Sequence, residues 1–196
     1  MTGHDQPYIA PFLEHHPEID ESVFIAATAA VVGAVRIGAK SSIWHQVTLR
    51  GDNNYITIGE GTNIQDNSCV HINSRFFPTI IGNNVNIGHS ALVHACQLHD
   101  HAFVGMGAIV MDGAVIESDA MLAAGALLTP GKTIPSGELW AGRPARKMRN
   151  LSKDDISNTR RIARHYVEVG RAHRLGAAGG PFENMHTQPL PPLDKG

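Results

Sequence analysis

The chain repeats an aliphatic side chain at intervals of six residues through most of its length. This period fits neither the 3.6-residue period of an amphipathic helix nor the strict alternation of a long flat strand. It is typical of a parallel β-helix of hexapeptide repeats, in which three short faces close a triangular coil of about 18 residues. The aliphatic positions are Ile25, Val31, Ile37, Ile43, Leu49, Ile58, Ile64, Val70, Ile81, Ile87, Val93, Leu98, Val104, Val110, Ile116, Leu122, Leu128 and Ile134.

These hexads predict an all-β fold of about six coils, with the aliphatic side chains stacked inside. Gly or another small residue often follows the aliphatic position, as in IGAKSS, IGEGTN and IGNNVN, and we attribute this to a tight turn. Residues are inserted after Leu49 and Val70, and one is missing after Val93. Because such breaks in repeat folds often lie near functional sites, the two that flank His71 and His94 deserve most weight.

A helix is predicted beyond the coils, with Ser152 as its N-cap, acidic residues in its first turn and Gly176 as its stop. We expect it to pack along one face of the coils. The chain thus divides into an N-terminal segment (1–22), the β-helix (23–140), the C-terminal helix (151–175) and a Pro/Gly-rich tail (176–196).

Composition and charge exclude several classes of protein. A net charge of -2 without a basic block argues against a nucleic-acid partner. The N-terminus has no signal-peptide pattern and no apolar stretch is long enough to span a membrane, so we expect a cytoplasmic protein. Cys69 and Cys96 do not make a disulfide framework, and we expect two small buried side chains.

Two histidines occupy equivalent outward positions in neighbouring coils. His71 follows the inward Val70, His94 follows the inward Val93, and without the insertion the pair lies one coil apart. They should therefore stack one strand spacing apart, about 4.8 Å. Two nitrogen ligands of one Zn²⁺ lie roughly 3.4 Å apart, a separation that modest side-chain rotation reaches.

His89 belongs to the preceding face, which is turned by about 120° in a triangular coil, so it points away from His71 and His94. A three-histidine site then needs His89 of another chain, and a threefold assembly would build three such sites with an open fourth position. The alternative is a ladder of histidines in solvent or in interface hydrogen bonds. His99 and His101 share neither relation, and we expect them on the surface or in supporting roles.

The motifs LRGD, NIQDNSCVH and IGHSALVHAC resemble the γ-class carbonic anhydrases, over about residues 20 to 170. The resemblance implies a left-handed β-helix, assembled as a homotrimer with metal between the subunits. It also implies His71, His89 and His94 as ligands of Zn²⁺, with Fe²⁺ or Co²⁺ possible, and the reversible hydration of CO2 to bicarbonate.

Other residues match the family one by one. Arg50 and Asp52 of LRGD correspond to an interface pair that either orients the bicarbonate region or is a purely structural interchain ion pair. Asp66 matches an interface carboxylate, for which a structural role is favoured over proton transfer.

Three more positions concern the pocket. Gln65 corresponds to the residue that hydrogen-bonds metal-bound water, and Asn63 is similar to a residue near the substrate. Tyr166 lies where short family members place a tyrosine over the metal site, although packing of its own helix explains it equally well.

The chain departs from the family at two places. The loop after the first histidine, INSRFFP, has no acidic residue, and Asn53 stands where a carboxylate follows RGD in many members. Both changes remove candidate proton shuttles. Because turnover needs a path for the proton, they put fast CO2 hydration in doubt.

Two other functions remain open. Hexapeptide repeats and the GRPARK segment also occur in acyltransferases, which would favour acyl transfer or CoA-thioester hydrolysis with a single histidine as base. The missing shuttle carboxylates instead favour a catalytically weak trimeric scaffold in which the metal only joins the subunits.

Overall fold

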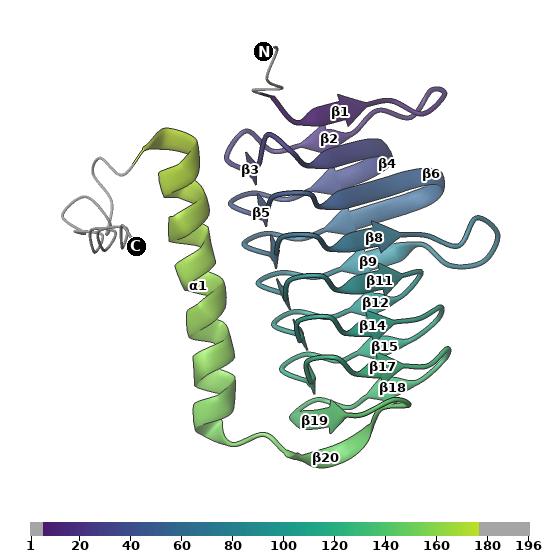
Figure 1. Cartoon of the computed structure of the whole chain (residues 1–196), viewed down its shortest axis with the longest axis vertical. Helices are drawn as coiled ribbons and strands as arrows, with labels where there is room; N and C mark the ends of the chain where they lie inside the picture. Colours follow the sequence, from purple (N-terminus) through teal and green to yellow (C-terminus); the bar gives the residue numbers. More distant parts are fainter. Residues whose placement is uncertain (1–5, 177–196) are drawn as a thin grey trace, which may run out of the picture.

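A computed structural model describes residues 6–176 as a left-handed parallel β-helix with one long helix beside it (Figure 1). The predicted fold class is confirmed. Face 1 of the coil is a sheet of short parallel strands whose neighbours are one coil apart. Its strands are β3 (Phe24–Ile25), β5 (Ser42–Ile43), β7 (Asn63–Ile64), β10 (Asn86–Ile87), β13 (Phe103–Val104), β16 (Met121–Leu122) and β19 (Glu138–Ala141).

Faces 2 and 3 belong to one sheet, because β4 (Ala30–Ile37) and β6 (Thr48–Ile58) run through the corner between them. Face 2 continues through β1 (Tyr8–Ala10), β8 (Cys69–His71), β11 (Leu92–His94), β14 (Ile109–Val110) and β17 (Leu127–Leu128). Face 3 continues through β2 (Glu18–Ile19), β9 (Thr79–Ile81), β12 (Gln97–Leu98), β15 (Val115–Ile116) and β18 (Thr133–Ile134).

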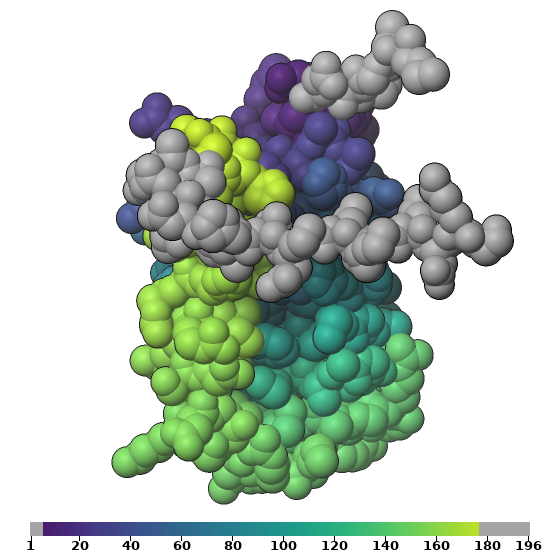
Figure 2. Space-filling model, turned by 60° about the vertical axis from the view of Figure 1, so that its left-hand side comes forward, coloured from purple at the N-terminus to yellow at the C-terminus, as the bar shows by residue number. Residues whose placement is uncertain are grey.

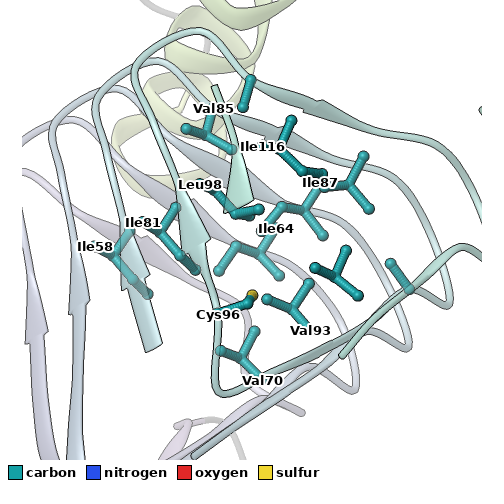
Figure 3. Close-up of a cluster of buried hydrophobic side chains, with 14 of the residues drawn as sticks. Ile58, Ile64, Val70, Ile81, Val85, Ile87, Val93, Cys96, Leu98 and Ile116 are labelled. Atoms are coloured by element: carbon teal, nitrogen blue, oxygen red, sulfur yellow. The ribbon is translucent and has the colours of Figure 1, made fainter. Parts of the chain in front are cut away.

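The aliphatic repeat forms the core, as Figure 3 shows for Ile64, Ile87 and Val93. Every repeat position is at most 3% exposed except Ile25, which is only partly buried on the terminal strand β3. A second inward position, two residues before the aliphatic one, was not predicted. It holds small residues on the later coils, namely Cys96, Ala102, Ala108, Ala114, Ala120 and Ala126.

The two cysteines are free thiols. Cys96 occupies the second inward position, and burial raises the pKa of its thiol far above the usual range. Cys69 lies on the outer side of β8 and is only partly buried, so the expectation of two buried cysteines is wrong for Cys69. Its side chain alternates outward because the next residue, Val70, points into the core.

Glycine follows the aliphatic positions for a different reason from the tight turn that the sequence suggested. The residues with positive φ are those two positions further on, such as Lys40 and Asn84, with φ of 60° and 54°. At Gly105, an added Cβ would lie only 2.3 Å from the backbone nitrogen of Ala124 in the next coil. Glycine is therefore needed there for close approach between coils, while the turn itself accepts several residue types.

The coils are extended at one end, and at the other end an antiparallel strand covers face 1. Strands β1 and β2 of the N-terminal segment pair with β4, so this segment adds to the first coil. At the C-terminal end, β20 (Arg146–Asn150) pairs antiparallel with β19. This strand reverses the chain towards the helix.

Helix α1 (Lys153–Leu175) lies along face 1, in contact with β3, β5, β7 and β10 (Figures 1 and 2). The predicted cap is confirmed, because Ser152 and Asp155 form a capping box, and Gly176 follows the last turn. No helix within residues 6–176 is long and apolar enough to cross a membrane. The tail predicted for 176–196 lies outside the described residues after Gly176.

We expect Gly105→Ala to lower stability by about 3 kcal/mol, because two backbone segments must separate to admit the methyl group. Gly107→Ala is the matched control. Gly107 has a φ of 65° and open space around it, so a methyl group there adds only backbone strain, roughly 1–2 kcal/mol. Thermal unfolding at equal protein concentration compares the two. Equal losses would contradict the close-approach explanation.

The helix cap should respond to acid. The hydrogen bond from Arg149 and those from Ser152 hold the pKa of Asp155 well below its usual range. The folded state therefore gains stability above the unfolded pKa, about 3.9, and loses it as the pH falls. The unfolding temperature of wild type should exceed that of Asp155→Asn by a constant margin above about pH 5 and by less near pH 3. A constant margin throughout would be inconsistent with this assignment.

Candidate metal centre

His71 and His94 are paired neighbours on β8 and β11, which confirms their predicted stacking. Each points outward because the preceding residue, Val70 or Val93, points into the core. The Nδ1 atom of His71 lies 3.3 Å from the Nε2 atom of His94. This separation is close to the roughly 3.4 Å between two nitrogen ligands of a tetrahedral Zn²⁺, so this pair fits a shared metal ion.

The opposite side of His71 faces an acidic residue. Its Nε2 atom lies 3.3 Å from the Oδ1 atom of Asp52, whose other oxygen accepts a hydrogen bond from Arg50. Burial acts to raise the pKa of Asp52, but the hydrogen bond with His71 and the charge of Arg50 outweigh it and leave that pKa lowered. Burial lowers the pKa of His71, which favours the neutral imidazole that binds metals.

His94 has a carboxylate partner that the sequence analysis did not identify. The Oδ1 atom of Asp112 lies 2.6 Å from Nδ1 of His94, and its Oδ2 atom accepts a hydrogen bond of 2.8 Å from Asn73. Burial acts to raise the pKa of Asp112, but the hydrogen bonds from Asn73 and His94 hold it below its usual value. The carboxylate is thus ionised at neutral pH and accepts from the imidazole.

His89 lies at a different corner of the coil. It follows β10 of face 1, whereas His71 and His94 end strands of face 2, so face 2 separates the two positions. Its Nδ1 atom is 2.9 Å from the Oδ2 atom of Asp66. Within residues 6–176 of one chain, no three His, Cys, Asp or Glu side chains gather to hold a metal. The three predicted ligands therefore do not meet within the chain.

Gln65 and Asn63 begin a chain of buried amides. Gln65 donates to the Oδ1 atom of Asn63 at 3.0 Å, and Asn63 donates to the Oδ1 atom of Asn86 at 2.7 Å. Asn86 in turn donates to the carbonyl oxygen of Thr159 in helix α1, at 3.1 Å. These bonds fix the orientation of each amide and leave the Oε1 atom of Gln65 as its accepting end.

Tyr166 packs on the coil rather than standing free. Its ring meets that of Trp44 edge to face, with centroids 5.7 Å apart. Burial, together with the negative charge of Asp66, raises the pKa of its hydroxyl. Tyr166 therefore lies on the side of the coil that carries Asp66 and His89, and it contributes to the packing of α1.

The other residues considered in the sequence analysis lie apart from the histidine–carboxylate pairs described above. His101 occupies one of the turn positions with positive φ, at 63°, and His99 follows β12 of face 3. In the loop between β8 and β9, Phe76 and Phe77 are exposed, at 68% and 44%. The loop thus presents two aromatic rings and contains no acidic residue.

Comparisons with known proteins support the fold and identify relatives of the chain. No family model matches the chain. It is 42% identical over 166 residues to a carbonic anhydrase of Geobacillus kaustophilus, covering 85% of this chain and 91% of the relative. It is 48% identical over 162 residues to the mitochondrial gamma carbonic anhydrase 2 of Arabidopsis thaliana, covering 80% of this chain.

The chain spans 58% to 63% of the length of the three Arabidopsis gamma carbonic anhydrases that it matches. Among solved structures, a hexapeptide transferase family protein of Anaplasma phagocytophilum is 48% identical, with a TM-score of 0.82. The match covers 85% of this chain and 98% of that one.

Proposed function

Since the chain belongs to the γ-class carbonic anhydrase family, we propose that it catalyses the metal-dependent, reversible hydration of CO2 to bicarbonate. The observation that carries the proposal is the pair His71 and His94, whose facing nitrogens lie 3.3 Å apart. Each ring has an acidic partner on its other nitrogen, Asp52 or Asp112. Ligand histidines in metal sites are oriented in this way.

The third ligand in this proposal is His89 of a neighbouring chain in a homotrimer. His89 stands at the opposite end of face 2, so a neighbour that places this corner against His71 and His94 completes the set. Its contact with Asp66 gives it the same kind of acidic partner. Three nitrogen ligands with an open position suit Zn²⁺, and Fe²⁺ or Co²⁺ fits the same donors.

When bound, such a metal lowers the pKa of its water to about 7 and so supplies a nucleophile at neutral pH. The chain's own residues then orient the reactants. Asn63 fixes the amide of Gln65, whose Oε1 atom is left as a hydrogen-bond acceptor. We assign to this atom the role of accepting a hydrogen bond from the water that attacks CO2. Arg50, held by Asp52, provides a positive charge beside His71 for the bicarbonate.

The acidic residues of the site are poor candidates for carrying the proton away. Asp52 is already engaged by Arg50 and His71, and its lowered pKa leaves it ionised and weakly basic at neutral pH. Asp66 is in contact with His89. We therefore assign structural roles to both, and we expect buffer to accept the proton and to limit the rate.

The likeness to a hexapeptide transferase supports acyl transfer or thioester hydrolysis as a second candidate. In that case turnover of a CoA thioester should persist in the presence of a chelator, and CO2 hydration should be absent. A trimer that holds the metal without hydrating CO2 would indicate a scaffold. The cytoplasmic location also stays a prediction, since the Arabidopsis relatives are named as mitochondrial.

The interchain site can be tested by mixing two inactive variants. His89→Ala keeps the His71 and His94 pair, whereas the double variant His71→Ala, His94→Ala keeps only His89. Each should lose bound metal and activity alone. Co-assembled in equal amounts, random trimers should regain about a quarter of the sites, because each mixed trimer has one complete junction. Metal analysis and stopped-flow CO2 hydration measure this recovery.

Single His71→Ala and His94→Ala chains serve as the matched control. Both changes damage the same half-site, so their co-assembly should restore no metal and no activity. Recovery in this control would place the two histidines in different half-sites. Retention of full metal and rate by His89→Ala alone would rule out the proposed third ligand.

A further inference from the structure

Asp112 makes the shortest contact between a carboxylate and any of the three proposed ligand histidines. Its Oδ1 atom lies 2.6 Å from Nδ1 of His94, whereas the contacts of His71 and His89 measure 3.3 and 2.9 Å. An ionised carboxylate only accepts hydrogen bonds, so the imidazole proton belongs on Nδ1. The Nε2 atom of His94, which faces His71, is then the unprotonated nitrogen that can bind a metal.

Asn73 holds the other oxygen of this carboxylate. Its Nδ2 atom donates to Oδ2 of Asp112 at 2.8 Å, across 39 residues of sequence. Both oxygens of Asp112 are therefore engaged, one by His94 and one by Asn73. A carboxylate fixed at both oxygens cannot rotate freely, and the imidazole bound to it keeps one orientation.

Asn73 also organises the loop between β8 and β9. Its Oδ1 atom accepts from the backbone nitrogens of Arg75 and Phe76, at 3.0 and 3.2 Å. Its own backbone nitrogen donates to the carbonyl oxygen of Phe77. A side chain that bonds to the backbone two and three residues further on fixes a turn, so the loop and the Asn73 amide form one unit.

We propose that Asp112 and Asn73 are positioning residues that hold His94 in its metal-binding tautomer and orientation, so that the loop between β8 and β9 sets the metal affinity. The inference rests on the proposed metal site. The loop that follows His71 thus acts on the second histidine, His94, through two side chains. It contributes to the centre by fixing a ligand, without an acidic group of its own.

Asp112→Asn tests the carboxylate. The substitution keeps the size of the side chain and removes its charge, and Asp112 lies outside the core. We expect the dissociation constant for Zn²⁺ alone, measured by chelator competition on the whole protein, to rise by about 10- to 100-fold. The visible spectrum of the Co²⁺ form should also shift, while the unfolding temperature of the metal-free protein stays near that of wild type.

Asp100→Asn is the matched control, because Asp100 also pairs with an asparagine, Asn83, at a corner of the coil. It contacts none of the proposed ligands, so Zn²⁺ affinity should not change. Asn73→Ala should weaken Zn²⁺ binding by itself and add little in the Asp112→Asn background, because it acts through that carboxylate.

The outcomes separate this inference from the proposed function. If wild type binds Zn²⁺ and loses it with His94→Ala, but Asp112→Asn binds as tightly as wild type, the positioning role is overturned and the metal site stands. If Asn73→Ala weakens binding equally in both backgrounds, the link through Asp112 is overturned. If wild type binds no Zn²⁺ through its histidines, both proposals fall together.

Discussion

The spacing between coils is the constraint on which the structure depends. Backbone hydrogen bonds between parallel strands set it at about 4.8 Å, and every residue must accept a neighbour at that distance. The constraint selects aliphatic side chains inside and glycine where the backbones approach most closely. It also brings His71 and His94 within 3.3 Å of each other, because they occupy equivalent places in successive coils.

Much of this could be predicted because the constraint repeats. The period of six identifies the fold, and counting along it places His71 beside His94 and separates His89 from both. The role of the glycines after the aliphatic positions was predicted wrongly, for a physical reason. Glycine marks either positive φ or close contact, and the sequence does not distinguish them. The structure assigns contact to Gly105 and positive φ to residues such as Asn84.

Asp112 could not be predicted because it does not occupy the position of the repeat that is equivalent to His94. In the next coil Val93 pairs with Val110, so the position equivalent to His94 is Met111, and Asp112 falls one residue beyond it, at a turn that follows the deleted residue. Its partner Asn73 lies in an insertion, where counting residues along the six-residue period does not predict their positions. A contact between an inserted loop and a turn depends on how both fold in three dimensions, and the six-residue period does not predict this. Similarly, the chain of amides that begins at Gln65 ends on helix α1, so it could not be predicted without knowing where the helix packs.

The antiparallel strand β20 has a consequence for how molecules of this protein meet. A stack of parallel coils presents unpaired backbone groups at its end, and such an edge invites another stack to continue it into a fibre. Here β20 covers β19 in the reverse direction and exposes Arg146, Lys147 and Arg149 along its length. Charged side chains on an edge strand oppose edge-to-edge aggregation. At this end of face 1, β20 therefore opposes the stacking of a further coil along the axis.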